Sequence, residues 1–588
     1  MKQRMGVFVA LMAALLVAAF GFAGPASASN EAGSSANKVQ SLQKKVKNLQ
    51  KKVKRATKKS KATCKKVRRA KGKKATRKAK KRCAASKKRV KKLKRNLKSA
   101  RKSLKKERAK PATANFDVCQ HGCAYRTVQD GVNAAGKWQF NNPKGSATVR
   151  IQPGTYVEGV YMHGSNPKHR FDDLTVMGVT ADKKPLADAS QVIFEGNNAK
   201  TIKKGNDPAW QPSDAETVPA QNAIEARNVQ GLVMKNMWAR HYLNNTFFVW
   251  ASTNPAFNER CSGYVMDNLI TSDTRSYGFF ARNCFGGEIT NSEGWNHGDS
   301  AVYIGETPCD DPNWTNRGAN PKPCQADPDW TVIDNVKSHQ NVLGYSGTNS
   351  KYVEIKNSAF YNNGAGIVPN TLDSEKFEPA GWMNIHDNDI FWNNYNYFST
   401  GSEFQTVSDG LGEVLGQTVN YPMGVGVVLF GTDGIEVKNN RIFGHEKWGA
   451  MTFSAPVANL PGVAEVEANK GDDAKNMNNR FIDNQMGRNG VDANQVDFLN
   501  HNTGGGNCFI GNTASPAVTY VLGNGNVPQA QLYPSACPAK PVLNKDVRSF
   551  DATAGVQVNL ADELDRDTIL GYAASAPARD QECSWDIK

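Results

Sequence analysis

The sequence predicts a mainly β chain, a solenoid of stacked parallel strands, preceded by a strongly basic helical arm. Three observations support this prediction. A short strand followed by asparagine recurs between 222 and 484, with several spacings of about 22 residues or twice that and longer ones that imply insertions, the pattern of stacked coils. Apolar residues with heptad spacing occur twice among the lysines of 38–110. The net charge changes sign after residue 110, which indicates a domain boundary.

The first 28 residues have the organisation of a secretory signal peptide. Lys2 and Arg4 are followed by an apolar run over 7–22 and by the small residues Ala26 to Ala28, a typical cleavage site. The alternative is a retained N-terminal anchor. No later stretch approaches the ~20 apolar residues of a membrane-spanning helix. We therefore expect a secreted protein, extracellular or associated with the cell wall, with no transmembrane segment after cleavage.

Charge divides the rest of the chain into two parts. Residues 38–110 contain 37 Lys and Arg and one acid, whereas 111–588 contain 36 Lys and Arg against 52 Asp and Glu. The whole-chain net charge of +21 describes neither part. We therefore assign residues 29–110 to a cationic arm and the remainder to an acidic domain.

The arm has the heptad spacing of a coiled coil. Its apolar seam consists of Val39, Leu42, Val46, Leu49 and Val53, then Val90, Leu93, Leu97, Ala100 and Leu104. Cys64 and Cys83 lie almost symmetrically about Gly72, so a turn there would give an antiparallel helical hairpin closed by a disulfide. A single long helix and a disordered cationic tail are the alternatives.

An arm with so many unbalanced positive charges should bind polyanions. Anionic cell-wall polymers, lipid headgroups, acidic polysaccharides and nucleic acids are the candidates. The arm has no aromatic residue to stack on bases, and the protein is expected to be exported, so nucleic acid is disfavoured. We expect attachment to an anionic envelope polymer or polysaccharide.

The chain has eleven cysteines, and export permits disulfides. Neighbouring positions suggest the pairs Cys64–Cys83, Cys119–Cys123, Cys261–Cys284, Cys309–Cys324 and Cys508–Cys537. Cys583 remains without a predicted partner. No Cys-x-x-Cys motif has a matching second pair, so no metal site is predicted.

The acidic domain repeats a strand and an asparagine. The asparagines that follow its short apolar strands are Asn236, Asn268, Asn291, Asn335, Asn357, Asn388, Asn440 and Asn484. Asparagine tolerates the left-handed conformation of tight corners, and stacked asparagines could bond to one another along the coils. A β-propeller is the structural alternative, but its blades are about twice as long and usually carry an aromatic signature, which is absent.

The segment Val149-Arg-Ile-Gln-Pro-Gly-Thr-Tyr-Val-Glu158, followed by these coils, resembles the pectate-lyase-like superfamily. The resemblance covers roughly 115–540 and implies a right-handed parallel β-helix, which we place at 111–540. Residues 541–588 would form a C-terminal tail or cap. Members of this superfamily include polysaccharide lyases, glycosidases, epimerases and non-catalytic surface proteins, so the fold does not choose among these activities.

One cluster of residues could carry chemistry. Asn296-His297-Gly298-Asp299 leads into a strand that contains Tyr303 and ends near Glu306, and Arg282 lies one coil earlier. A lyase or epimerase could use His297 or Tyr303 as the base and Arg282 to stabilise the developing charge. Hydrolysis could use the carboxylates of Asp299 and Glu306. The structural alternative is a tight turn beside an ordinary ion pair.

The loop from Glu306 to Trp330 is a candidate wall of a sugar-binding surface. It contains Asp310, Asp311 and Trp314 and ends at Trp330. Tryptophan beside carboxylates suits sugar binding, although a structural flap with buried tryptophans would have the same composition. No calcium-ligand motif is present, so we expect no cofactor.

These observations predict a secreted cell-surface protein that binds carbohydrate or another partner and is attached to anionic envelope polymers by its arm. A polysaccharide lyase or epimerase acting on an acidic glycan is the alternative. The acidic domain would repel such a substrate, which favours the first interpretation.

Overall fold

The computed structural model describes residues 30–108, 112–202, 217–308, 327–372, 375–395, 423–453, 475–488, 490–500, 505–520 and 533–538. The predicted signal peptide and the 541–588 tail lie outside these ranges. Most of the regular secondary structure in the described ranges is β-strand, in a 20-stranded and a 12-stranded sheet. Among the helices of the described ranges, none is both long and apolar enough to cross a bilayer.

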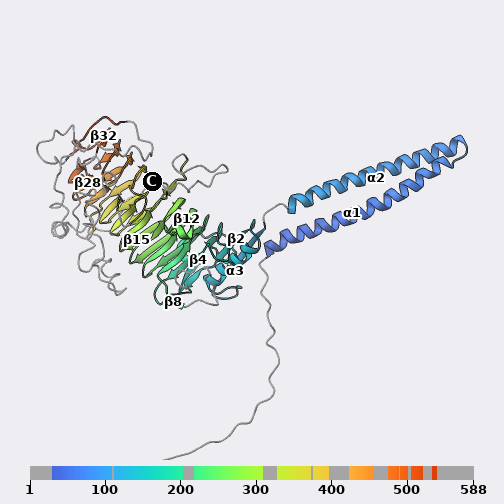
Figure 1. Ribbon diagram of the computed structural model, residues 1–588, viewed down its shortest axis with the longest axis horizontal. Helices are drawn as coiled ribbons and strands as arrows, with labels where there is room; N and C mark the ends of the chain where they lie inside the picture. Colours follow the sequence, from blue (N-terminus) through green and yellow to red (C-terminus); the bar gives the residue numbers. More distant parts are fainter. Residues whose placement is uncertain are drawn as a thin grey trace, which may run out of the picture.

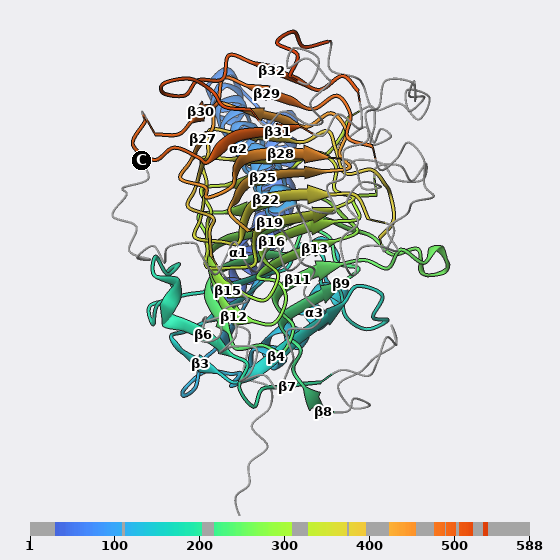
Figure 2. The ribbon, with the colours of Figure 1, turned by 90° about the vertical axis from the view of Figure 1, so that its left-hand side faces the viewer.

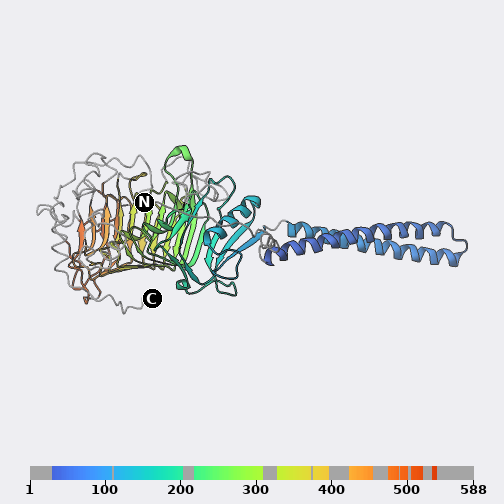
Figure 3. The same ribbon diagram turned by 90° about the horizontal axis from the view of Figure 1, so that it is seen from below.

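The arm is a pair of α-helices, α1 (Asn30–Arg68) and α2 (Lys73–Arg108). They lie side by side and project from one end of the β-structure (Figures 1 and 3). Gly72 makes the turn with a φ of 89°, a conformation that glycine adopts at little cost. The Cys64–Cys83 disulfide and a 3.1 Å hydrogen bond between the hydroxyls of Ser60 and Ser86 join the helices.

Parallel pairing links each turn of the chain to the next, and Figure 2 shows the resulting stack of strands. The 20-stranded sheet contains two series of paired strands, which share the long strands β10 and β12. The first series consists of β1 (Thr113–Val118), β2 (Ser146–Ile151), β5 (Thr175–Gly178), β10 (Val233–Arg240), β12 (Cys261–Thr274), β14 (Cys284–Thr290), β17 (Thr331–Asp334), β20 (Val353–Lys356), β23 (Asn384–His386), β26 (Glu436–Lys438), β29 (Arg480–Ile482) and β32 (Cys508–Ile510).

The second series runs along the same sheet. It adds β3 (Gly154–Tyr156), β6 (Val192–Glu195), β15 (Glu293–His297), β18 (Lys337–His339), β21 (Ala359–Tyr361), β24 (Asp389–Phe391), β27 (Arg441–Phe443) and β30 (Gln485–Met486).

The 12-stranded sheet forms a third series. It consists of β4 (Glu158–His163), β9 (Asn222–Arg227), β11 (Asn245–Trp250), β13 (Phe279–Arg282), β16 (Ser300–Gly305), β19 (Leu343–Thr348), β22 (Ala365–Asn370), β25 (Val425–Phe430), β28 (Trp448–Phe453) and β31 (Val496–Asn500), with β7 (Lys200–Ile202) and β8 (Thr217–Pro219) at its edge.

Register places like side chains above one another. One inward column of the first series is Ile289, Ile333, Ile355, Ile385, Val437, Phe481 and Phe509. All seven belong to one continuous buried core. A strand of three or four residues buries little apolar surface alone, so each turn is stabilised by the turns on either side.

The asparagines form corners and ladders, but in two ways. Asn291, Asn335 and Asn357 adopt positive φ themselves. In later turns the preceding residue takes this conformation, and Asn388 and Asn440 point inward. Their side chains form a chain of amide bonds: Asn388 donates to Asn440 at 3.0 Å, and Asn440 donates to Asn484 at 3.1 Å. The predicted ladder therefore exists at Asn388, Asn440 and Asn484, while the corner conformation there lies one residue earlier.

A second column, on the outer side of the 20-stranded sheet, is aromatic. Its rings stack with nearly parallel planes in the order Trp295, His339, Tyr361, Phe391 and Phe443, with centroids 4.9–5.7 Å apart. Their faces are occupied by one another, so the column stabilises the register of the strands.

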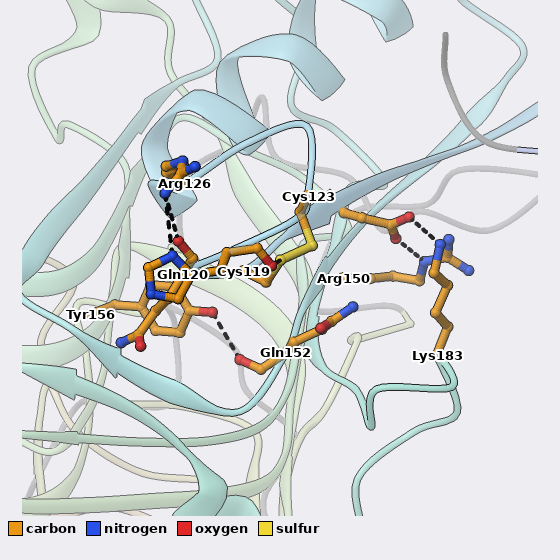
Figure 4. The surroundings of a disulfide bond; sticks show 10 residues. Cys119, Gln120, Cys123, Arg126, Arg150, Gln152, Tyr156 and Lys183 are labelled. Carbon is orange, nitrogen blue, oxygen red and sulfur yellow. Dashed lines mark hydrogen bonds and ion pairs between the residues drawn. A yellow bond between two sulfur atoms is a disulfide. The ribbon is translucent and has the colours of Figure 1, made fainter. Parts of the chain in front are cut away.

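Helix α3 (Val128–Asn141) packs against β1, β2 and β4 at the end of the β-structure nearest the arm (Figure 3). The Glu158 carboxylate accepts hydrogen bonds from the Val128 and Gln129 amides at its N-terminus. Figure 4 shows the adjoining Cys119–Cys123 disulfide. Nearby, Asp117 binds Arg150 and Lys183 (Figure 4).

Four of the five predicted disulfides are joined: Cys64–Cys83, Cys119–Cys123, Cys261–Cys284 and Cys508–Cys537. Cys261 and Cys284 face each other in β12 and β14, so this bond ties one turn to the next. The predicted Cys309–Cys324 pair and Cys583 lie outside the described residues.

Candidate functional site

The candidate site lies on the 12-stranded sheet at β13 and β16. Parallel pairing places Phe280 beside Tyr303 and Arg282 beside Gly305. A side chain at Gly305 would collide with the Tyr303 ring, whose nearest carbon would lie 2.3 Å from an added Cβ. The glycine therefore leaves room for this tyrosine to lie across the strand.

Arg282 and Glu306 form a bidentate ion pair. The Arg282 Nε lies 2.8 Å from Oε2 of Glu306, and Nη2 lies 3.3 Å from Oε1. Glu306 is buried, whereas 39% of the Arg282 side chain is exposed. A positive charge thus reaches the solvent while its carboxylate partner remains inside.

Glu375 completes the site, and no feature of its local sequence points to it. It follows β22, 69 residues after Glu306, in a loop without a motif. The Tyr303 hydroxyl donates to Glu375 Oε1 at 2.5 Å, and the Lys376 amide donates to Glu306 Oε1 at 3.1 Å. Asn349 also donates to the Glu375 carbonyl. We call Arg282, Asp299, Tyr303, Glu306 and Glu375 the carboxylate cluster.

Two carboxyls of the cluster are held partly protonated near neutral pH. Burial raises the pKa of Asp299 to about 7, against the opposing effects of Tyr277 and Ser300. Burial also raises the pKa of Glu375 to about 7; Glu306 and Asp299 act in the same direction, and Tyr303 and Arg282 oppose them. Within the described chain, Asp299 Oδ1 and Glu375 Oε2 are buried and accept no hydrogen bond. Each carboxyl therefore keeps one buried oxygen whose hydrogen-bonding capacity is unused.

Tyr303 is poorly suited to act as a base. Burial raises the pKa of its phenol well above the usual value, and Glu375 and Tyr277 act in the same direction. Its proton is directed at Glu375. In this arrangement Tyr303 is a hydrogen-bond donor to the carboxyl.

His297 faces the core and does not join the cluster. It is fully buried, and its ring contacts the hydroxyls of Thr274 at 2.6 Å and Thr271 at 3.3 Å. Burial lowers its pKa to about 3. The alternation of strand β15 turns this residue inward, so it cannot reach a substrate outside the sheet.

Aromatic side chains adjoin the cluster. Tyr277 lies 4.5 Å from Phe280 and 4.6 Å from Tyr303, measured between ring centroids. Phe280 stacks on Phe248 at 4.3 Å. Trp250, the register neighbour of Arg282, lies beneath the Arg227 guanidinium at 4.6 Å. Tyr277, Phe248 and Trp250 are partly exposed and give the site an apolar border.

A second buried ion pair lies one strand beyond Trp250. Arg227 Nε contacts Glu259 at 2.8 Å, and both side chains are almost completely buried. Glu225 accepts from the Trp250 indole at 3.2 Å. With these residues, five acids lie near the site against three cations, Arg227, Arg282 and the exposed Lys376.

Trp330 packs elsewhere. Its ring contacts Tyr352 edge to face at 5.4 Å, and it lines a hollow of about 460 Å³ beside Tyr264 and Asp329 on strands of the 20-stranded sheet. The structure therefore brings together Arg282, Asp299, Tyr303 and Glu306 but leaves Trp330 apart. Asp310, Asp311 and Trp314 lie outside the described residues.

No protein-family model matches the chain, and no curated protein is significantly similar to it. The similar solved structures include the catalytic unit of a GH87 α-1,3-glucanase from Streptomyces thermodiastaticus strain HF3-3, with 14% identity, a TM-score of 0.37, and coverage of 69% of this chain and 65% of that one. XylC in complex with xylose has 9% identity, a TM-score of 0.35, and coverage of 71% and 87%.

A rhamnogalacturonan lyase is also similar, with 12% identity, a TM-score of 0.29, and coverage of 78% of this chain and 98% of that one. This chain thus spans less than two thirds of the glucanase unit. These resemblances are too distant to assign an activity, so the chemistry of the site must be argued from its residues.

Proposed function

We propose that this chain is an exported, glycan-hydrolysing surface protein whose carboxylate cluster cleaves a neutral polysaccharide. The observation that carries the proposal is the gathering of carboxyls from several turns: Tyr303 donates to Glu375, and Arg282 is paired with Glu306. Burial raises the pKa values of Glu375 and Asp299 to about 7, which supports it. The three series of parallel strands would form the right-handed parallel β-helix that the sequence predicts, with the glycan crossing successive strands on its outer face.

Glycoside hydrolysis needs one protonated carboxyl and one ionised carboxyl. Asp299 and Glu375 interact electrostatically, so losing a proton from one raises the cost of ionising the other. With both pKa values raised to about 7, each carboxyl would be protonated in part of the molecules near neutral pH. We assign Glu375 as the general acid, oriented by Tyr303, and Asp299 as the carboxylate that activates water or attacks the sugar.

The charge of the surroundings favours a neutral substrate. Arg282 is the exposed cation of the cluster, but it is bound to Glu306, and acids outnumber arginines around it. A uronate chain would be repelled, and a lyase would need a base at Tyr303 or His297. The first holds its proton and the second lies in the core. These observations favour hydrolysis over the lyase or epimerase reaction.

The test is release of reducing ends from a panel of neutral polysaccharides by the full chain. Asp299→Asn and Glu375→Gln should each lower kcat by about a hundredfold or more, the usual scale for losing a positioned acid or base, while Glu288→Gln, an exposed control on the 20-stranded sheet, should not. If both variants hydrolyse at the rate of the parent chain, Asp299 and Glu375 are not the catalytic carboxyls. Unsaturated products from uronate polymers would show a lyase instead.

We further propose that the arm attaches the protein to anionic polymers of the cell envelope. The reason is its excess of Lys and Arg, joined to a domain of opposite charge. Retention on whole envelopes should fall steeply with salt, because the attraction is electrostatic. Retention that is insensitive to salt would contradict this assignment.

A further inference from the structure

Positive charge surrounds the helical arm on every side that faces away from the seam. Residues 41–104 contain 32 Lys and Arg and no Asp or Glu. All of these cations are exposed. On α1, Lys47, Lys54 and Lys61 lie on one flank of the seam, whereas Lys45, Lys52 and Lys59 lie on the other, as follows from about 100° of rotation per residue.

The apolar seam between α1 and α2 is narrow. Leu42, Leu49, Leu93 and Leu97 are only partly buried, and of the described arm side chains only Ser60 and Ala100 are fully buried. Hydrophobic burial along this seam is therefore small, while the cations of the two helices repel one another.

The Cys64–Cys83 disulfide joins the helices where the residues of the seam are smallest. Cys64–Cys83 joins them on the tip side of the Ser60–Ser86 hydrogen bond. Beyond it, the inward positions carry the small residues Ala70, Thr76 and Ala79, together with Val67. Without the disulfide, little apolar contact would hold α1 and α2 together near the turn, where both helices are rich in lysine.

A hollow of about 460 Å³ lies between the helices, close to the Cys64–Cys83 disulfide. Its floor includes Thr57, Ser60 and Val90, and its border carries the cations Lys61, Lys87, Lys91, Lys94, Arg95 and Lys98. The hydroxyls of Thr57 and Ser60 are bonded within the hairpin, so the border of cations is what suits the anionic groups of a polymer that follows its surface.

We infer that the Cys64–Cys83 disulfide preorganises the arm as a binding site for a flexible, linear polyanion that wraps around both helices. A flat bilayer or a stiff nucleic-acid duplex would contact only one side of a hairpin charged all round. Lysines, which act as point charges, outnumber arginines here, so recognition depends on charge density rather than on a particular anionic group. The inference rests on the attachment part of the proposed function.

Long-chain inorganic polyphosphate is the probe, because it is flexible and has neither bases nor a bilayer. The full chain should bind it with an affinity that falls at least tenfold between 50 and 200 mM salt, which is a modest loss for a site with several ionic contacts. Duplex DNA and anionic vesicles serve as competitors. Displacement of polyphosphate by either at equal charge concentration would overturn the assignment to a flexible polymer.

The Cys64→Ser/Cys83→Ser variant tests whether the disulfide preorganises the arm. It should lose part of its helical circular dichroism, bind polyphosphate about tenfold more weakly, and regain helicity at saturating polyphosphate. An unchanged near-ultraviolet spectrum would show that the β-structure is intact. If the variant has the helicity and affinity of the parent, the disulfide does not preorganise the arm, although the arm can still attach the protein to polyanions. If the parent chain does not bind polyphosphate, both preorganisation and attachment are wrong.

Wrapping is tested by neutralising one flank of α1 at a time. Two triple Lys→Gln variants serve as matched partners, one at Lys47, Lys54 and Lys61 and the other at Lys45, Lys52 and Lys59. A polymer that wraps should lose similar affinity from either set, within about twofold. A loss confined to one set would show that a single face binds, which contradicts wrapping.

Discussion

Replacing Asp299 with asparagine should change how the stability of the protein depends on pH. Burial raises the pKa of this carboxyl from 3.8 to about 7 in the folded chain. The folded state therefore holds the proton more tightly than the unfolded state does. The resulting stabilisation is fully present below about pH 4 and is lost as the pH rises to about 7.

The size of this effect follows from the pKa difference. One pKa unit corresponds to about 1.4 kcal/mol, so raising the Asp299 pKa from 3.8 to about 7 gives an upper limit of roughly 4 kcal/mol lost between these pH values. Asparagine does not ionise, so the Asp299→Asn variant lacks this dependence. Any cost of the amide in the buried site is a constant offset at every pH.

The assay is urea unfolding of the full chain at pH 4.5, 6 and 8, followed by tryptophan fluorescence. The stability of Asp299→Asn relative to the parent should rise steadily over this range. Glu375→Gln should behave alike, with a smaller amplitude because its carboxyl starts from 4.5. Glu288→Gln, whose side chain is exposed, is the control. Parallel curves for the parent and Asp299→Asn would refute the reasoning.

Three further substitutions test the roles of other residues. Asn440→Ala removes both ladder bonds and leaves the buried backbone N–H of Asn388 without its acceptor, so it should cost about 3 kcal/mol in chemical unfolding. Asn335→Gly, in an exposed corner whose positive φ glycine tolerates, should cost less than about 1 kcal/mol, and equal costs would contradict the ladder. His297→Gln should lower stability by about 1–3 kcal/mol without moving the pH optimum of hydrolysis; a shifted optimum would restore it as a catalytic candidate. Trp330→Ala should lower the melting temperature and leave glycan affinity unchanged in calorimetry, so weaker binding would place Trp330 in the site.

The repeat was readable from the sequence because its physical causes are local. A two-residue alternation produces the strands, and residues that tolerate positive φ produce the corners, as at Asn335 and Asn357. The position of the ladder was harder to assign, since both residues of Asp387-Asn388 fit the corner pattern, and only the structure shows that Asn388 points inward.

The site was predicted only in part for a related reason. Arg282, Tyr303 and Glu306 lie near one another along the chain at distances that match the repeat, so stacking could be anticipated. Glu375 arrives from a loop two turns later, and nothing in its local sequence marks it. His297 was misleading because a histidine in a polar turn looks available, whereas the strand that precedes the turn directs its ring into the core.

The carboxylate cluster is built from several stacked turns, because Arg282, Tyr303 and Glu375 come from three different turns of the chain. Adding or removing one complete turn between β16 and β22 would shift the Glu375 loop by about 4.8 Å, the spacing of neighbouring strands, without disturbing the pairing pattern. Catalytic geometry in such an architecture can therefore change in discrete steps. A relative with one turn more or fewer would keep the shape of the molecule and lose the chemistry proposed for it.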